Sequence, residues 1–231
     1  MNSENSQAVA ARWAGAAALI GLASVVVVQA GAIIIAGQRV SGTSDADAIR
    51  AYFAHPNLLW TYLVGGAGFV AIVVLAVALR RYLRGAGTDP TAHILADAAA
   101  ALIIVEMAVG AVELGLQSAL VQLSSHAPGE TGGILAVFAA WDWIYNAQLY
   151  WFEVGALLFV SWAAARTAAL PGWLVTLGLL GAAAQVFNAT VLVLGLPDTL
   201  SLPGNMLFAA WFASLGIWLL REAGRLATRS A

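Results

Sequence analysis

The stretch Leu58–Leu79 reads LLWTYLVGGAGFVAIVVLAVAL and contains no charged residue. A helix of about 20 apolar residues is long enough to cross the roughly 30 Å hydrocarbon core of a bilayer, so this stretch predicts a transmembrane helix. The composition of the whole chain agrees, because 61% of its 231 residues are hydrophobic and only 10% are charged, with a mean hydropathy of +0.86. Soluble domains carry about 25% charged residues. The sequence therefore predicts an integral membrane protein whose first partner is the lipid bilayer.

Five further apolar runs lie on either side of this stretch, and the predicted fold class is an all-α, polytopic transmembrane bundle of six helices. Asp89-Pro90 supplies a cap and a first-turn proline ahead of the third span, and Pro171 has the same first-turn role for the fifth. The third and fourth runs are longer than a bilayer requires and should tilt or project beyond it. Within a single domain, 1–231, the predicted spans are approximately 13–37, 58–79, 92–123, 133–166, 172–195 and 204–221.

The arginines orient the predicted bundle. Only Arg39 and Arg50 fall at one end of the spans, and the other eight fall at the opposite end. The positive-inside rule then places both termini in the cytoplasm of a multi-pass protein of the bacterial inner membrane. A cleaved signal peptide is the alternative for the first span, since Val28-Gln29-Ala30 imitates a cleavage site. The apolar run of about 25 residues, however, is longer than the apolar region of a signal peptide, which has 7 to 15 residues.

The first outer connection, 41–57, reads SGTSDADAIRAYFAHPN and predicts a short interfacial helix. Ser44 is expected to cap this helix, with Asp45 and Asp47 in its first turn. Its apolar side would rest on the periplasmic membrane surface, and a solvated loop is the alternative. The residues on that side are Ile49, Tyr52 and Phe53.

Composition also excludes several kinds of chemistry. The chain has no cysteine, which excludes disulfides, iron–sulfur clusters and thiolate metal sites. It has no lysine for a Schiff base, and a net charge of −2 gives no reason to expect a nucleic-acid partner. The three histidines, His55, His93 and His126, fall in loops or at span ends, so no metal site is predicted. The sequence assigns no cofactor.

Ionisable residues inside a span cost roughly 2.5 to 3.5 kcal/mol each and therefore need a reason. In the third span, Glu106, Glu113 and Gln117 share one helical stripe, whereas Asp97 points to the opposite face. In the fourth span, Asn146 and Glu153 lie on one stripe with Asp142. The fifth span combines small residues with amides on one face, as a close helix contact would. The residues of that face are Gly178, Gly181, Gln185 and Asn188.

Depth separates these residues. Counting about 1.5 Å per residue from the cytoplasmic ends, Glu106, Glu153 and Gln185 each lie roughly 20 Å into the membrane. Glu113 falls near the outer boundary, and the aromatic residues of 141–145 fall in an interfacial belt. Two carboxyl groups that face each other in a low dielectric do not both ionise cheaply, so at least one of Glu106 and Glu153 is expected to be protonated at neutral pH.

These residues define a predicted buried polar site, and three functions are compatible with it. The first is a small transporter that handles a proton, a cation or a small solute. The second is a non-catalytic membrane subunit or scaffold in which the same residues lock the helices together. The third is an intramembrane enzyme that acts on a lipid-like substrate. The predicted site comprises Glu106, Glu113, Gln117, Asn146, Glu153, Gln185 and Asn188. The sequence specifies neither substrate nor oligomeric state.

Three stretches carry a resemblance to a known family. They are Arg80-Arg81-Tyr82-Leu83-Arg84, the run LPGWLVTLGLLGAAAQVFN at 170–188, and AAWFASLGIWLLR at 209–221. In this layout the chain resembles, over nearly its full length, a family of six-helix membrane proteins known only as a domain of unknown function and common in actinobacteria. The resemblance implies a polytopic membrane fold and no established activity, and the acidic stripes are not carried over from it.

Overall fold

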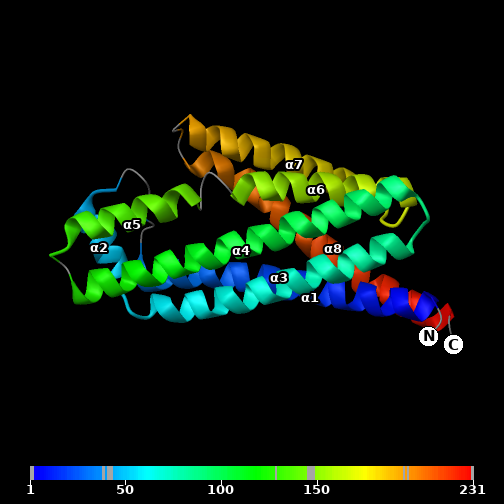
Figure 1. Cartoon of the computed structure of the whole chain (residues 1–231), viewed down its shortest axis with the longest axis horizontal. Coiled ribbons are helices and arrows are strands. Elements are labelled where there is room, and N and C mark those ends of the chain that lie inside the picture. The colour runs from blue at the N-terminus through cyan, green and yellow to red at the C-terminus, as the bar shows by residue number, and fades with distance from the viewer. Residues whose placement is uncertain are drawn as a thin grey trace.

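The computed structural model describes residues 3–37, 40, 44–127, 129–144, 149–194, 196 and 198–229, and the regular elements in this part of the chain are helices. No strand occurs in this part of the chain (Figure 1). The helices are α1 (Ser3–Ala36), α2 (Ala46–Phe53), α3 (Leu58–Gly85), α4 (Pro90–His126), α5 (Thr131–Trp143), α6 (Leu149–Thr167), α7 (Gly172–Val193), the 3-10 helix η2 (Asp198–Ser201) and α8 (Leu202–Arg229).

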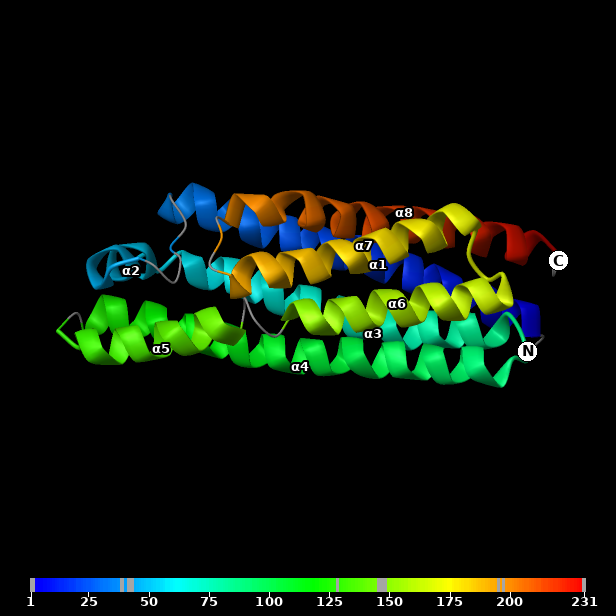
Figure 2. The same ribbon diagram turned by 90° about the horizontal axis from the view of Figure 1, so that it is seen from above.

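Six long helices form a closed ring. α1 packs against α3, α3 against α4, α4 against α6, α6 against α7 and α7 against α8, which returns to α1. The six run lengthwise through the molecule, and both chain termini lie at the same end, called here the terminal end (Figures 1 and 2). Within the described residues, α1, α3, α4, α7 and α8 are each long and apolar enough to cross a membrane. The chain is therefore a multi-pass membrane protein.

The ring closes where α1 and α8 cross at two glycines. A Cβ atom on Gly15 would lie 2.8 Å from the carbonyl oxygen of Gly216, and one on Gly216 would lie 3.1 Å from the carbonyl oxygen of Gly15. Only hydrogen at both positions lets the two backbones approach this closely. The first and last helices of the chain are thus direct neighbours.

The region expected to form one span over 133–166 contains two helices, α5 and α6, and residues 145–148 between them lie outside the described part. A single helix over that range would be about 50 Å long, well beyond the roughly 30 Å hydrocarbon core. The 19 residues of α6 already span about 28 Å at 1.5 Å per residue. α6 alone is therefore the ring helix of this region, and α5 packs outside the ring against α4 and α2.

α5 and α2 cover the end of the molecule opposite the termini, where both pack against α4; this unit is called here the distal cap (Figure 1). The ring of Phe53 packs edge-on against Phe138 and Trp141 of α5, with centroids 6.3 and 5.8 Å apart. The predicted short helix is present, but its cap is Asp45 and not Ser44, because Asp45 Oδ1 accepts from the amide of Ala48 at 2.7 Å. Its apolar side is buried against protein and does not rest on lipid.

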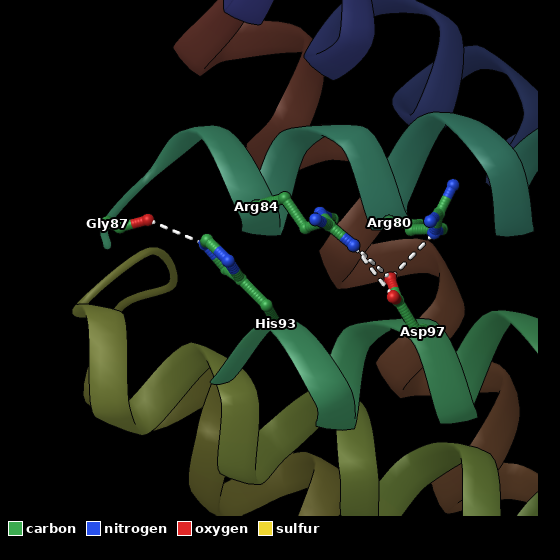
Figure 3. A network of polar contacts seen from close by, with 5 residues as sticks. All are labelled: Arg80, Arg84, Gly87, His93 and Asp97. Atoms are coloured by element: carbon green, nitrogen blue, oxygen red, sulfur yellow. Dashed lines mark hydrogen bonds and ion pairs between the residues drawn. The ribbon is translucent and has the colours of Figure 1, made fainter. Parts of the chain in front are cut away.

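Ion pairs join the helices at the terminal end. Asp97 of α4 accepts from Arg80 Nε at 2.7 Å and from Arg84 Nη1 at 2.7 Å, both on α3 (Figure 3). The neighbouring His93 ring contacts the carbonyl oxygen of Gly87 at 2.8 Å. Asp97 thus points away from the acidic stripe, as predicted, and these arginines explain a carboxylate near the helix end.

The predicted cap of α4 and the predicted start of α7 at residue 172 are confirmed, but Pro171 is not in the first turn of α7. Asp89 caps α4 through the amide of Thr91 at 2.9 Å, with Pro90 as the first helical residue. Asp89 Oδ2 also accepts from Arg166 Nε of α6 at 2.6 Å. Pro171 is the cap residue of α7 and precedes its first turn.

Candidate functional site

A cavity of about 500 Å³ lies inside the helix ring. All six ring helices contribute side chains to its wall, and α2 and α5 contribute at the distal end. Small-molecule sites in proteins have volumes of about 300 to 1,000 Å³ and mostly apolar walls with a few polar groups. Among the described residues of this wall there is no arginine or histidine. The polar groups of the wall are Ser24, Gln29, Tyr52, Tyr62, Glu106, Glu113, Gln117, Tyr150, Glu153, Gln185 and Asn205.

Helical periodicity brings the acidic side chains to this wall. On α4, Glu106, Gly110, Glu113 and Gln117 follow one another at intervals of three or four residues, and all four line the cavity. On α6, Glu153 lies three residues after Tyr150 on the same face. Because α4 and α6 are neighbours in the ring, their two stripes meet.

Glu106 and Glu153 line the same cavity from two neighbouring helices, α4 and α6. Their carboxyl groups influence each other electrostatically. The Oε2 atom of Glu153 is buried and has no hydrogen-bond partner. A buried acceptor without a donor costs about 1 to 3 kcal/mol, and more when it is charged. The pair is therefore suited to binding something that brings positive charge or a proton.

Three amide side chains, those of Gln185, Asn188 and Asn205, form a hydrogen-bonded group next to Glu153. Asn188 Nδ2 donates to Gln185 Oε1 at 2.6 Å and to Asn205 Oδ1 at 3.0 Å. Gln185 also lies beside the carboxyl group of Glu153 in the cavity wall. Since Gln185 Oε1 already accepts from Asn188, its Nε2 group is the one that remains for Glu153. Gln185 and Asn188 are each only 1% exposed, so this relay links α6, α7 and α8 within the protein interior.

A second polar group lies on α4 about 10 Å toward the distal cap, two turns beyond Glu106. Glu113 Oε1 accepts from Gln117 Nε2 at 3.1 Å and from Trp141 Nε1 at 3.2 Å. Glu113 was expected near the outer membrane boundary and Trp141 in an interfacial belt. Trp141 does not lie on an interfacial belt, because it is buried within the distal cap and against Glu113. Glu113 is also buried, and its depth near the outer boundary stays a prediction.

The structure brings most of the predicted site residues to one cavity. Glu106, Glu113, Gln117, Glu153 and Gln185 line its wall. Asn188 lies directly behind Gln185. Asn146 lies outside the described residues.

Several polar contributors to the wall were not predicted, and Asn205 and Trp141 show why. Asn205 is a single amide in the first turn of α8, next to the sequence Leu202-Pro203-Gly204, and an isolated amide at a span end does not stand out. Trp141 was misjudged, because a tryptophan on a membrane belt and one under a protein cap have the same sequence signal. In both cases the deciding information is a contact with another helix.

A sequence profile for a domain of unknown function (DUF4386) matches residues 13–222, which include the described wall of the cavity. The chain belongs to the DUF4386 family. This agrees with the resemblance to a membrane family without an established activity. No curated protein and no solved structure matches this DUF4386 chain.

The donor set of this DUF4386 cavity differs from that of a metal site. Among the residues that the structure describes, no three or more His, Asp or Glu side chains come together as metal ligands would. His93 and His126 contact backbone carbonyl oxygens at the ends of α4, at 2.8 and 3.2 Å. The cavity offers carboxyl groups, amides and aromatic faces.

Proposed function

We propose that the protein is a small membrane carrier that binds a proton or a cation at the Glu106–Glu153 pair. The observation that supports the proposal is the presence of these two carboxyl groups in the wall of one cavity that has no cationic side chain among its described wall residues. Two adjacent carboxylates in a low dielectric repel each other, and their full ionisation is costly. A shared proton or a bound cation removes that repulsion, so the pair can exchange one for the other.

The cavity favours a carrier over a scaffold. Protein interiors are close-packed, and empty volume lowers stability. A bundle held together only for assembly gains nothing from a space of about 500 Å³ at its centre. The amide relay also orients one acid and leaves its Oε2 atom unpartnered, which suits a ligand site better than a helix lock.

We further propose that the six ring helices cross a bacterial cytoplasmic membrane with both termini on the cytoplasmic side. Eight of the ten arginines belong to the terminal end by their positions in the sequence, which is the distribution that the positive-inside rule requires. The common end of the two termini supports an even number of crossings.

Infrared spectroscopy of the purified protein during a pH titration tests the carrier proposal. We expect a protonated-carboxyl band at neutral pH, where an ordinary carboxyl group is ionised, and we expect this band to disappear in Glu153→Gln, which keeps the shape but loses the proton. Glu130→Gln is the matched control, because Glu130 is exposed in the α4–α5 connection. A spectrum identical in wild type and Glu153→Gln, together with a melting curve that Na⁺, Mg²⁺, Ca²⁺ and Mn²⁺ do not shift, would contradict the proposal and favour the scaffold.

A further inference from the structure

We propose that the solute bound in this cavity is an amphipathic organic cation, a positive charge carried on an apolar or aromatic body. The inference rests on the proposed function, because it takes the Glu106–Glu153 pair as the binding site for charge. It adds the chemical class of the ligand, which follows from the remainder of the wall.

The wall provides aromatic surface around the acids. Phe208 and Phe212 of α8 lie one turn apart with ring centroids 4.8 Å from each other, and both face the cavity together with Trp211. Phe69 and Tyr62 contribute from α3 on another side. A cation above an aromatic face gains about 0.5 to 2 kcal/mol, the larger value where water is excluded. Apolar and aromatic groups of a ligand would bury their surface on the same wall.

The charges of the wall all have one sign. Glu106, Glu113 and Glu153 line the cavity, and no described wall residue is cationic. An anionic solute would face these carboxyl groups without any compensating charge, and a neutral apolar solute would leave the pair without a partner. A cationic solute removes the repulsion between Glu106 and Glu153.

Two buried acceptor atoms in the wall also favour a cationic ligand. Glu153 Oε2 and Gln117 Oε1 are buried without a hydrogen-bond donor, and the Gln117 residue is only 8% exposed. Both atoms accept hydrogen bonds, so a ligand that supplies N–H groups or a diffuse positive charge compensates them. The two acceptors belong to different levels of the cavity, which suits a ligand with an extended body.

An inorganic ion fits this wall less well. Ca²⁺ takes six to eight oxygen ligands and Mg²⁺ takes six in near-octahedral geometry. The described residues form no cluster of three or more carboxyl or imidazole groups, and most of the wall is apolar. An organic cation needs only one compensating acid and uses the apolar wall as well.

Calorimetric titration of the purified full chain with two ions of the same shape and opposite charge tests the inference. Tetraphenylphosphonium is the cationic probe and tetraphenylborate the anionic one, with heats from protein-free micelles subtracted. We expect saturable binding of the phosphonium only. The double variant Glu106→Gln/Glu153→Gln should weaken phosphonium binding at least about tenfold, which corresponds to about 1.4 kcal/mol. Glu130→Gln should bind like the wild type.

A second variant guards against loss of folding in the double variant. Phe208→Leu retains an apolar side chain but removes an aromatic face, and it should weaken phosphonium binding roughly two- to fivefold. Equal binding of the two ions, no saturable phosphonium binding, or full binding by the double variant would overturn the inference. If phosphonium does not bind while the infrared band that depends on Glu153 is present, the ligand class is wrong and proton handling stands. If that band is also missing, both proposals fail.

Discussion

Asp89 connects two helices through a single carboxylate at the terminal end. It caps α4 and pairs with Arg166 in the last turn of α6. The hydrogen bond from Arg166 holds the pKa of Asp89 below its usual value of about 3.8; desolvation opposes this shift, and the amide of Thr91 reinforces it. A pKa that is lower in the folded state stabilises the fold above the unfolded pKa. That contribution is lost as the pH falls through the lower, folded pKa.

We predict that Asp89→Ala lowers the melting temperature at neutral pH more than Asp89→Asn does. Asparagine still caps the helix, whereas alanine loses both the cap and the ion pair. The difference between wild type and Asp89→Asn should begin to shrink as the pH falls below about 4, where the unfolded chain takes up the proton, and should vanish only below the lower pKa of the folded Asp89 carboxylate. Thermal unfolding in detergent as a function of pH measures this. A difference that grows toward acid pH would show that the ion pair does not stabilise the ring.

At the scale of the element, periodicity predicted which residues share a helix face. Glu106, Glu113 and Gln117 lie on one side of α4 because 3.6 residues per turn fixes their angles whatever the helix contacts. The division of 133–166 into α5 and α6 was not predicted. A helix that crosses the bilayer and a helix that covers another helix have the same apolar sequence pattern. The arginine partners of Asp97 were likewise missed, since they belong to α3.

The close contact between α1 and α8 makes the stability of the protein sensitive to a side chain at Gly15. Gly15→Ala should destabilise the protein by about 1 to 3 kcal/mol, because its Cβ would meet the backbone of Gly216 and neither helix can yield without opening the ring. Gly224→Ala is the matched control in α8, where a Cβ meets nothing within 4 Å. It should be neutral or stabilise by about 0.5 to 1 kcal/mol. The free energy of unfolding in a denaturing detergent provides the measurement, and equal stabilities of the two variants would refute the close contact.

The whole molecule is a ring of six helices with a capped distal end and an arginine-rich terminal end. The sequence predicted the helical class and the membrane setting, because both follow from composition and run length. It did not predict the order of helices around the ring or the cavity within it, because these depend on contacts between helices far apart in the chain. The acids were therefore identifiable as unusual before their meeting place was known.

The absence of cysteine makes the orientation directly testable. We predict that a cysteine at Glu130, in the connection before α5, reacts with a membrane-impermeant maleimide added outside intact cells. A cysteine at Thr88, in the exposed connection between α3 and α4, should react only after the membrane is permeabilised. Both positions are exposed, so reactivity reports sidedness. Labelling of Thr88→Cys from outside would reverse the proposed orientation.

Closure of the ring by its first and last helices has a consequence for biosynthesis. A chain enters the membrane from its N-terminus. α1 can therefore pack against α3 early, but it lacks its contact with α8 until α8 has been translated. Until then the site is an open trough, and the carboxyl groups of Glu106 and Glu153 have no enclosing wall on the α8 side. A chain that ends before Leu202 keeps its acids but never encloses them. The binding site therefore forms only when α8 packs against α1 and α7, so insertion of the last helix and completion of the site coincide.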